Sequence, residues 1–410
     1  MADDRPPAAT PATASASATG SAVGSAAGSP VGSATATSSG LRLPAPVNRL
    51  PEFPWDSLLP ARRQAAEHPQ GMVDLSIGTP VDRVPLPVRR ALADGSEAPG
   101  YPTVHGRAAL RQAYANWLER AHGVTGLDPA AVMPTIGSKE FVAALPTLLG
   151  LRPGDAVVIP ELAYPTYEIG AIMAGATVLR SDSLTAVGPD RIALLWLNSP
   201  SNPTGKVLPV EHLAKVVSWA RSRGTVVASD ECYIDLGWES TPVSILHPDV
   251  CGGDHTGLLA VHSLSKRSNM AGYRAGFVSG DPTLVAALVA ARRHLGAMVP
   301  TPVQAAAQAA LEDDAHVMAQ RSRYGRRREI LRDALDGAGF QVSSEAGLYL
   351  WCTRGEPAMR TVDWFAERGI LVGPGTVYGH AGLNHVRVAL TAPDDHVTAA
   401  AERLERRSRR

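Results

Sequence analysis

Between residues 156 and 278, short apolar runs alternate with longer stretches in which apolar residues recur every three or four positions. Several runs are apolar without strict alternation, which is typical of strands covered on both faces of a sheet. The helical spacing is clear over Val210–Ser222. The runs that we predict to be strands are Ala156–Ile159, Thr177–Leu179, Ile192–Leu197, Thr225–Ala228, Leu258–Val261 and Gly276–Val278. This order predicts an α/β fold with a mostly parallel sheet flanked by helices.

Composition divides the rest of the chain. Of the first 40 residues, 34 are Ala, Ser, Thr, Gly or Pro, so 1–40 can bury too little apolar surface to offset the entropy of ordering. We predict a disordered tail there. Two prolines near residue 300 interrupt the alternating pattern, and an Ala-, Arg- and Glu-rich stretch predicts a long helical region from 303 to about 337. We expect a large domain over 76–300 and a smaller α+β domain over 301–410, with 41–75 packed against the smaller domain.

Charge and cysteine content exclude several classes of protein. Lys plus Arg and Asp plus Glu both number 39, whereas a protein that binds nucleic acid normally carries a clustered positive excess. The three cysteines show no C-x-x-C spacing and no H-E-x-x-H pair occurs, so neither a disulfide framework nor a metal site is expected. Asp3 and Asp4 stand where a secretory signal needs positive charge. No apolar run reaches the roughly 18 residues that span a bilayer. We expect a cytoplasmic protein with no membrane or nucleic-acid partner.

Three polar residues follow three different predicted strands. Asn202, Asp230 and Lys266 each come within a few residues of a strand end. Ligands of open α/β sheets bind outside the carboxyl ends of the strands. Each residue alone is weak evidence for a ligand site, since a lone Asp after a strand is most often a helix cap. Their coincidence predicts a ligand site at one edge of the sheet.

The motifs at these positions are Ser199–Gly205, Asp230-x-x-Tyr233, Ser263-x-Ser265-Lys266 and Arg274-x-Gly276. Together they resemble the class I/II aminotransferases, which are pyridoxal 5'-phosphate enzymes of the aspartate-aminotransferase fold (fold type I). Three further stretches look most like the actinobacterial type of succinyldiaminopimelate aminotransferase. These are Ser229–Glu239, His262–Ala275 and Met298–Ala306.

The resemblance assigns the catalytic chemistry to three residues. Lys266 is the candidate amine for the cofactor's aldehyde and for moving a proton, and burial beside positive charges would keep that amine neutral. Asp230 would hold the pyridine nitrogen protonated through a charge-assisted hydrogen bond. By resemblance, Tyr233 and Asn202 hydrogen-bond the phenolic oxygen of the ring, and Tyr164 stacks on its face.

The phosphate of the cofactor is a dianion and needs donors. Ser263, Ser265 and Arg274 would supply two hydroxyls and a guanidinium. The segment that follows residue 136 opens a helical pattern, and a helix N-terminus presents free N–H groups to phosphate. The residues that the resemblance places in this part of the phosphate site are Gly137, Ser138 and Lys139.

The resemblance also implies how substrate binds. Arg387 stands among apolar residues in a strand-like pattern, where a buried arginine needs an anionic partner, and it would clamp the α-carboxylate. Gly78 would border the substrate. Tyr101 would reach the cofactor phosphate of a neighbouring subunit, which implies a two-fold symmetric homodimer with shared active sites. A second cation should bind a distal carboxylate, and Lys139 and Arg83 are candidates.

The function that the resemblance implies is transfer of an amino group between glutamate and 2-oxoglutarate on one side and N-succinyl-LL-2,6-diaminopimelate on the other, for lysine biosynthesis. Another amino-acid aminotransferase or a β-elimination lyase of the same fold stays open. A transcription regulator built on this fold is disfavoured, because 1–40 cannot form a DNA-binding helix-turn-helix. We interpret Glu345–Trp351 as a packing strand of the smaller domain and 373–379 as a loop near the substrate.

Overall fold

A seven-stranded sheet forms the larger part of the fold. The computed structural model describes residues 50–188 and 191–405, so the predicted tail lies outside the described residues. The strand order is β2-β8-β7-β6-β5-β3-β4. The strands are β2 (Val132–Ile136), β3 (Ala156–Ile159), β4 (Thr177–Arg180), β5 (Ile192–Asn198), β6 (Val226–Asp230), β7 (Leu258–Ser263) and β8 (Ala275–Gly280). Neighbours pair in parallel except β8, which is antiparallel to both β7 and β2.

All six predicted strands are confirmed, with boundaries that differ by no more than two residues. The strand that sequence analysis missed is β2, which contains Pro134. Proline cannot donate to a ladder and is tolerated on edge strands, and β2 is at the edge of the sheet.

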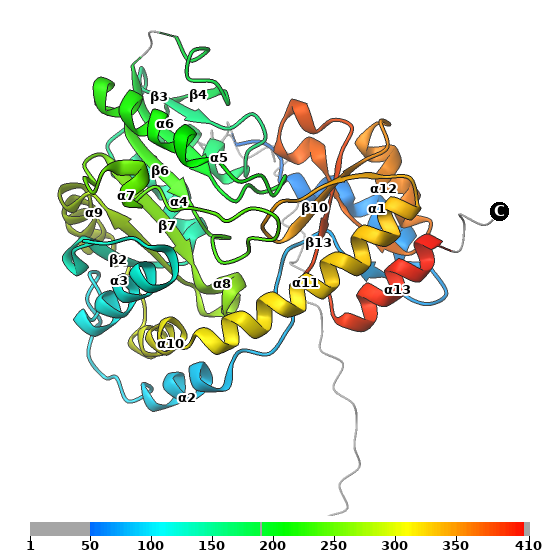
Figure 1. The fold of residues 1–410 in the computed structure, drawn as a ribbon, viewed down its shortest axis with the longest axis horizontal. Coiled ribbons are helices and arrows are strands. Elements are labelled where there is room, and N and C mark those ends of the chain that lie inside the picture. The colour runs from blue at the N-terminus through cyan, green and yellow to red at the C-terminus, as the bar shows by residue number, and fades with distance from the viewer. Residues whose placement is uncertain (1–49, 189–190, 406–410) are drawn as a thin grey trace, which may run out of the picture. The chain divides into compact units, whose positions relative to one another are not determined.

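Helices cover both faces of this sheet (Figure 1). They are α3 (Ala108–His122), α4 (Ser138–Leu148), α5 (Thr166–Ala174), α6 (Val210–Arg223), α7 (Pro248–Cys251), α9 (Pro282–Leu295) and α10 (Thr301–Glu312). Along β5, Leu195 packs in one buried cluster and Leu194 and Trp196 pack in another. Both faces of the strand are therefore buried, which explains the continuous apolar run.

A smaller antiparallel sheet has the order β12-β13-β10-β9. Its strands are β9 (Gln341–Ser343), β10 (Tyr349–Thr353), β12 (Gly373–Pro374) and β13 (Val386–Ala389). Beside it, β1 (Val73–Asp74) pairs in parallel with β11 (Ile370–Leu371). The accompanying helices are α1 (Leu59–Ala66), α11 (Asp314–Gly337), α12 (Ala358–Ala366) and α13 (Asp394–Glu405). The domain boundaries at residues 76 and 300 stay a prediction.

One sequence interpretation in this region was wrong in detail. The expected strand from Glu345 begins only at Tyr349, and Ala346 forms no more than an isolated bridge. The predicted helical region is confirmed and consists of two helices, because Asp313 leaves the helical conformation and its side chain accepts the N–H of Ala315 as a new N-cap.

Short elements complete the fold. They are α2 (Leu86–Asp94), α8 (Leu264–Arg267) and the 3₁₀ turns Pro54–Leu58, Pro129–Ala131, Ala271–Tyr273, Gly375–Tyr378 and His380–Gly382. Over residues 50–188 and 191–405, each helix is too short or too polar to cross a membrane. Because β5, β6 and β7 are neighbouring parallel strands, the residues at their carboxyl ends meet at one edge of the sheet.

Candidate active site

A cavity of about 360 Å³ lies at this edge. Residues from the large sheet, the small sheet and the N-terminal segment all line it. Those that sequence analysis had singled out are Gly78, Ser138, Lys139, Tyr164, Asn202, Asp230, Tyr233, Ser263, Ser265, Lys266, Arg274 and Arg387. The structure thus brings together twelve of the candidates around one space.

Three candidate residues do not line this cavity. Gly137 lies next to the side chain of Arg274, which does line the cavity. Tyr101 is 96% exposed, and its expected role in a neighbouring subunit stays a prediction. Arg83, one of the two suggested anchors, is exposed and also lies outside the cavity lining.

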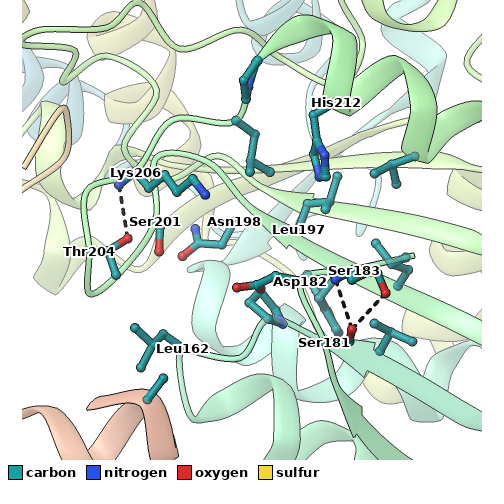
Figure 2. A pocket seen from close by; sticks show the side chains of 18 of the residues that line it. Leu162, Ser181, Asp182, Ser183, Leu197, Asn198, Ser201, Thr204, Lys206 and His212 are labelled. Carbon is teal, nitrogen blue, oxygen red and sulfur yellow. Dashed lines mark hydrogen bonds between the residues drawn. The ribbon is translucent and has the colours of Figure 1, made fainter. Parts of the chain in front are cut away.

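A larger cavity of about 790 Å³ shares Asn198 with the first (Figure 2). Lys206 and His212 contribute to its wall, and Asp182 and Ser183 line it as well. None of the predicted site residues lines it. Size alone would select this cavity, but the chemistry of the side chains selects the smaller one.

Lys266 lies on the one-turn helix α8, immediately after β7. Its Nζ donates a hydrogen bond to the carbonyl oxygen of Gly78. Burial lowers the pKa of Lys266, and the charges of Arg387 and Arg274 lower it further against the opposing effect of Tyr349. A neutral amine, which is the nucleophilic form, is therefore easier to reach than for a lysine in water.

Asp230 ends β6 and is 6% exposed. Its Oδ2 accepts from the Tyr167 hydroxyl at 2.7 Å, and its Oδ1 accepts from the Cys232 N–H at 3.2 Å. Burial raises the pKa of Asp230 even though these hydrogen bonds lower it. In the described part of the chain Asp230 forms no ion pair, so this carboxylate is available to pair with a cationic group of a ligand.

Donors for a phosphate gather beside the lysine. Ser138 begins α4, and Gly137 before it has φ +76°. A Cβ on Gly137 would lie 2.2 Å from Arg274 Nη2, so glycine lets the guanidinium reach the helix N-terminus. Ser263 and Ser265 are buried, and the Ser263 hydroxyl accepts the Ser265 N–H at 3.2 Å. Hydroxyls, a guanidinium and free helical N–H groups are the donor set that a phosphate dianion requires.

Arg387 is a buried cation with only neutral partners in the described residues. It is 3% exposed, and it donates to Asn202 Oδ1 at 2.9 Å and to the Ser76 carbonyl oxygen at 2.7 Å. Its Nε is buried without a hydrogen bond. The Tyr349 ring lies 3.8 Å from the guanidinium carbon. A buried arginine in this state attracts a carboxylate.

Sequence analysis missed several residues of the cavity. Trp55 and Tyr167 were not singled out, and Tyr349 was assigned to packing, yet all three line it. The Tyr349 hydroxyl is 3.2 Å from that of Tyr233. Burial raises the pKa of Tyr349, but the charges of Arg387 and Lys266 outweigh it, so its pKa lies below the usual value. Tyr167, three residues after Tyr164 in one motif, offered the clearest signal that was overlooked.

Comparison with known proteins gives the same picture. The family model described as aminotransferase class I and II matches residues 70–404. A probable aminotransferase of Mycobacterium tuberculosis is 62% identical over 356 residues, which cover 87% of this chain and 85% of that protein. The 4-dedimethylamino-4-oxo-anhydrotetracycline transaminase of Streptomyces rimosus is 56% identical over 359 residues, which cover 87% of this chain and 100% of that protein. A probable N-succinyldiaminopimelate aminotransferase from Thermus thermophilus, a solved structure, has a TM-score of 0.77 at 28% identity and covers 86% of this chain and 99% of that one.

Asp230 is a buried carboxylate that forms no ion pair within residues 50–188 and 191–405, and together with the phosphate donors and the enclosed lysine it fits pyridoxal phosphate, the cofactor of this family. The described chain has the aspartate-aminotransferase fold. The chain therefore belongs to the class I and II aminotransferases and depends on pyridoxal phosphate.

Proposed function

We propose that this aminotransferase moves an amino group between glutamate or 2-oxoglutarate and N-succinyl-LL-2,6-diaminopimelate. The observation that carries the proposal is the placement of Arg387, a buried arginine without a carboxylate partner in the described residues, on the cavity that holds Lys266. Such a site suits an α-amino acid. The name of the Thermus thermophilus structure supports the succinylated substrate.

The roles of the chain's own groups follow from the geometry. When bound, pyridoxal phosphate supplies an aldehyde that takes up the amino group and a ring that accepts electrons from the substrate carbon. Arg387 would bind the α-carboxylate, and Asp230 would keep a positive charge on the ring nitrogen. Lys266, whose pKa is lowered by burial, would take a proton from the carbon of the amino donor in the first half-reaction. It would give a proton to the carbon of the amino acceptor in the second.

Lys139 is the proposed anchor for the distal carboxylate that both substrates carry. Its side chain is exposed on the cavity lining, whereas Arg83 does not reach that lining. The other cations that line the cavity are Lys266, Arg274 and Arg387, and each already has a proposed role. An exposed ion pair contributes little, so we expect Lys139 to tune substrate preference rather than to decide it.

A different acceptor is the main alternative. The Streptomyces rimosus relative is named as a transaminase of an oxo-anhydrotetracycline, and its 56% identity favours testing a polycyclic ketone. A β-elimination lyase is a further alternative, because the same lysine and acid could serve it.

A donor–acceptor panel on the purified protein with added cofactor tests the proposal. We expect N-succinyl-LL-2,6-diaminopimelate with 2-oxoglutarate to give the highest kcat/KM. A polycyclic ketone or another amino acid that exceeds it would replace the proposed substrate. Release of ammonia and pyruvate without a keto acid would replace the reaction itself.

Two matched variants test the anchor. Lys139→Met should raise the KM of substrates with a distal carboxylate by about two- to fivefold, the size expected for one exposed ion pair. The KM of alanine should stay unchanged, because alanine has no distal carboxylate. Arg83→Met removes a nearby exposed charge and should leave every KM unchanged. A loss that Lys139→Met shows equally for alanine would remove the anchor role.

A further inference from the structure

The segment between β1 and α2 carries part of the active site without helix or strand structure of its own. Gly78 and Thr79 line the cavity, and the Gly78 carbonyl oxygen accepts the hydrogen bond from Lys266. The fit is close, because a Cβ on Gly78 would lie 2.2 Å from the Tyr349 hydroxyl oxygen. Val81, shortly after it, is 52% exposed, so apolar packing does not fix the segment at that point.

Asp82 fixes this end of the segment instead. Its Oδ1 accepts from Arg327 Nη2 at 2.8 Å, and its Oδ2 accepts from Arg327 Nη1 at 2.9 Å and from Gln320 Nε2 at 2.8 Å. The side chains of Arg327 and Asp82 are only 2% and 10% exposed. Arg327 also donates through Nε to Asp394 Oδ1 at 2.6 Å, which ties the pair to α13. A bidentate pair of this kind sets orientation as well as distance.

The helix that holds Asp82 also holds the loop of the catalytic lysine. Gln320 lies on α11, and its Oε1 accepts from Asn269 Nδ2 at 2.9 Å. Asn269 follows Lys266 by three residues and has φ +54°, a left-handed conformation that asparagine tolerates. Its Nδ2 also donates to the Arg83 carbonyl oxygen at 3.3 Å. Further along its length, α11 packs against α13 (Figure 1).

We infer that Asp82 and Arg327 are positioning residues for the transamination. They brace the segment of Gly78 against α11, and α11 braces the loop of Lys266, so the substrate edge and the amine keep one spacing. Neither residue lines the cavity, so their effect passes through Gly78. Reaction rates depend steeply on such spacing, because a misplacement of about 1 Å can cost on the order of 100-fold.

Asp82→Asn tests this inference, because it keeps the shape of the side chain and removes the charge. The kcat and KM for glutamate and the dissociation constant for pyridoxal phosphate are measured on the same preparation. We expect kcat to fall by about 10- to 100-fold. The dissociation constant of the cofactor should stay within about twofold, since the residues proposed to bind the cofactor are unchanged.

Arg323→Met is the matched control. Arg323 Nη1 also reaches Asp82 Oδ1, at 3.1 Å, but its side chain is 41% exposed, and exposed pairs contribute little. This variant should turn over like the parent enzyme. An Asp82→Asn enzyme with the kcat of the control would overturn the inference, and so would a parallel loss of cofactor affinity, which would indicate a general role in the fold.

Removing the charge of Asp82 leaves Arg327 with one carboxylate fewer in a buried place, which can prevent folding. Gln320→Met is the second variant, because it breaks the link between Asn269 and Asp82 without leaving an unpaired charge. We expect a fall in kcat of about 3- to 10-fold, as one hydrogen-bonded link is lost. If Asp82→Asn does not fold, this variant decides: an unchanged kcat would overturn the inference.

Discussion

Two regions of the active site are built in different ways. One, which we call the floor, consists of Asp230, Ser263 and Lys266, which lie at or just after the ends of β6 and β7. The other, which we call the wall, consists of Gly78 and Arg387, which line the same cavity. The register of two adjacent strands places the floor. The wall depends on a hydrogen bond from Arg387 to Ser76, a residue 311 positions away in the chain.

This difference predicts how each region responds to mutation. The floor is stabilised by the ladder of the large sheet and by two buried apolar clusters. In the wall, Arg387 is held by the ladder of the smaller sheet, but Gly78 lies in a segment without helix or strand structure, and directional contacts join these two distant segments. We therefore expect removal of a floor side chain to cost the most turnover, and changes in the wall to leave cofactor binding intact.

The largest effect should come from Lys266→Ala, which removes the amine from the floor. General acid–base catalysis alone is worth about 10²- to 10⁴-fold, so turnover should fall at least that far. The visible band of the cofactor-loaded protein should disappear after dialysis, as read by absorbance. A variant that kept both the band and turnover would show that Lys266 does not have its proposed role. The floor would then not be the region on which the chemistry depends.

Arg387→Ala should give the next largest effect, and it acts on the wall. Truncating one partner of a buried charge pair costs about 2–5 kcal/mol, which is roughly a 30- to 4000-fold loss in kcat/KM. The KM should rise for every amino-acid substrate, because all share the α-carboxylate, while the affinity for pyridoxal phosphate stays. A loss confined to one substrate would instead make Arg387 an anchor for that side chain.

The same contrast decides how much could be predicted from the sequence. Strands β3 to β8 of the large sheet and the positions of Asp230 and Lys266 were predictable, because a polar residue that closely follows an apolar run in an α/β pattern falls at the carboxyl edge of the sheet. Trp55 and Tyr349 were not. Whether a tyrosine on a short strand faces a cavity or a core depends on which distant segment packs against it, and alternation along the strand does not show this.

Tyr167→Phe should have a smaller effect, which acts on the floor through Asp230. The hydrogen bond from its hydroxyl lowers the pKa of Asp230 against the effect of burial, so its loss should raise that pKa further. The acidic limb of the pH profile of kcat/KM should then move to higher pH, with a loss of roughly tenfold, as expected for a hydrogen bond to a charged group. Tyr114→Phe is the matched control, since Tyr114 is as buried and its hydroxyl contacts His262 and Ser279.

The smallest effect should come from Tyr349→Phe, which changes a ring that lies against Arg387 of the wall. The ring stays beneath the Arg387 guanidinium at 3.8 Å, so binding of the α-carboxylate should change little and KM should stay within about twofold. What is lost is the hydroxyl at 3.2 Å from Tyr233, and one hydrogen bond of this kind contributes about 0.5–1.5 kcal/mol, or roughly 2- to 13-fold in kcat. Steady-state kinetics with glutamate and 2-oxoglutarate separate the two parameters. A rise in KM comparable to that of Arg387→Ala would mean that this hydroxyl itself holds substrate, and Tyr349 would then contribute to the wall through its oxygen rather than through its ring.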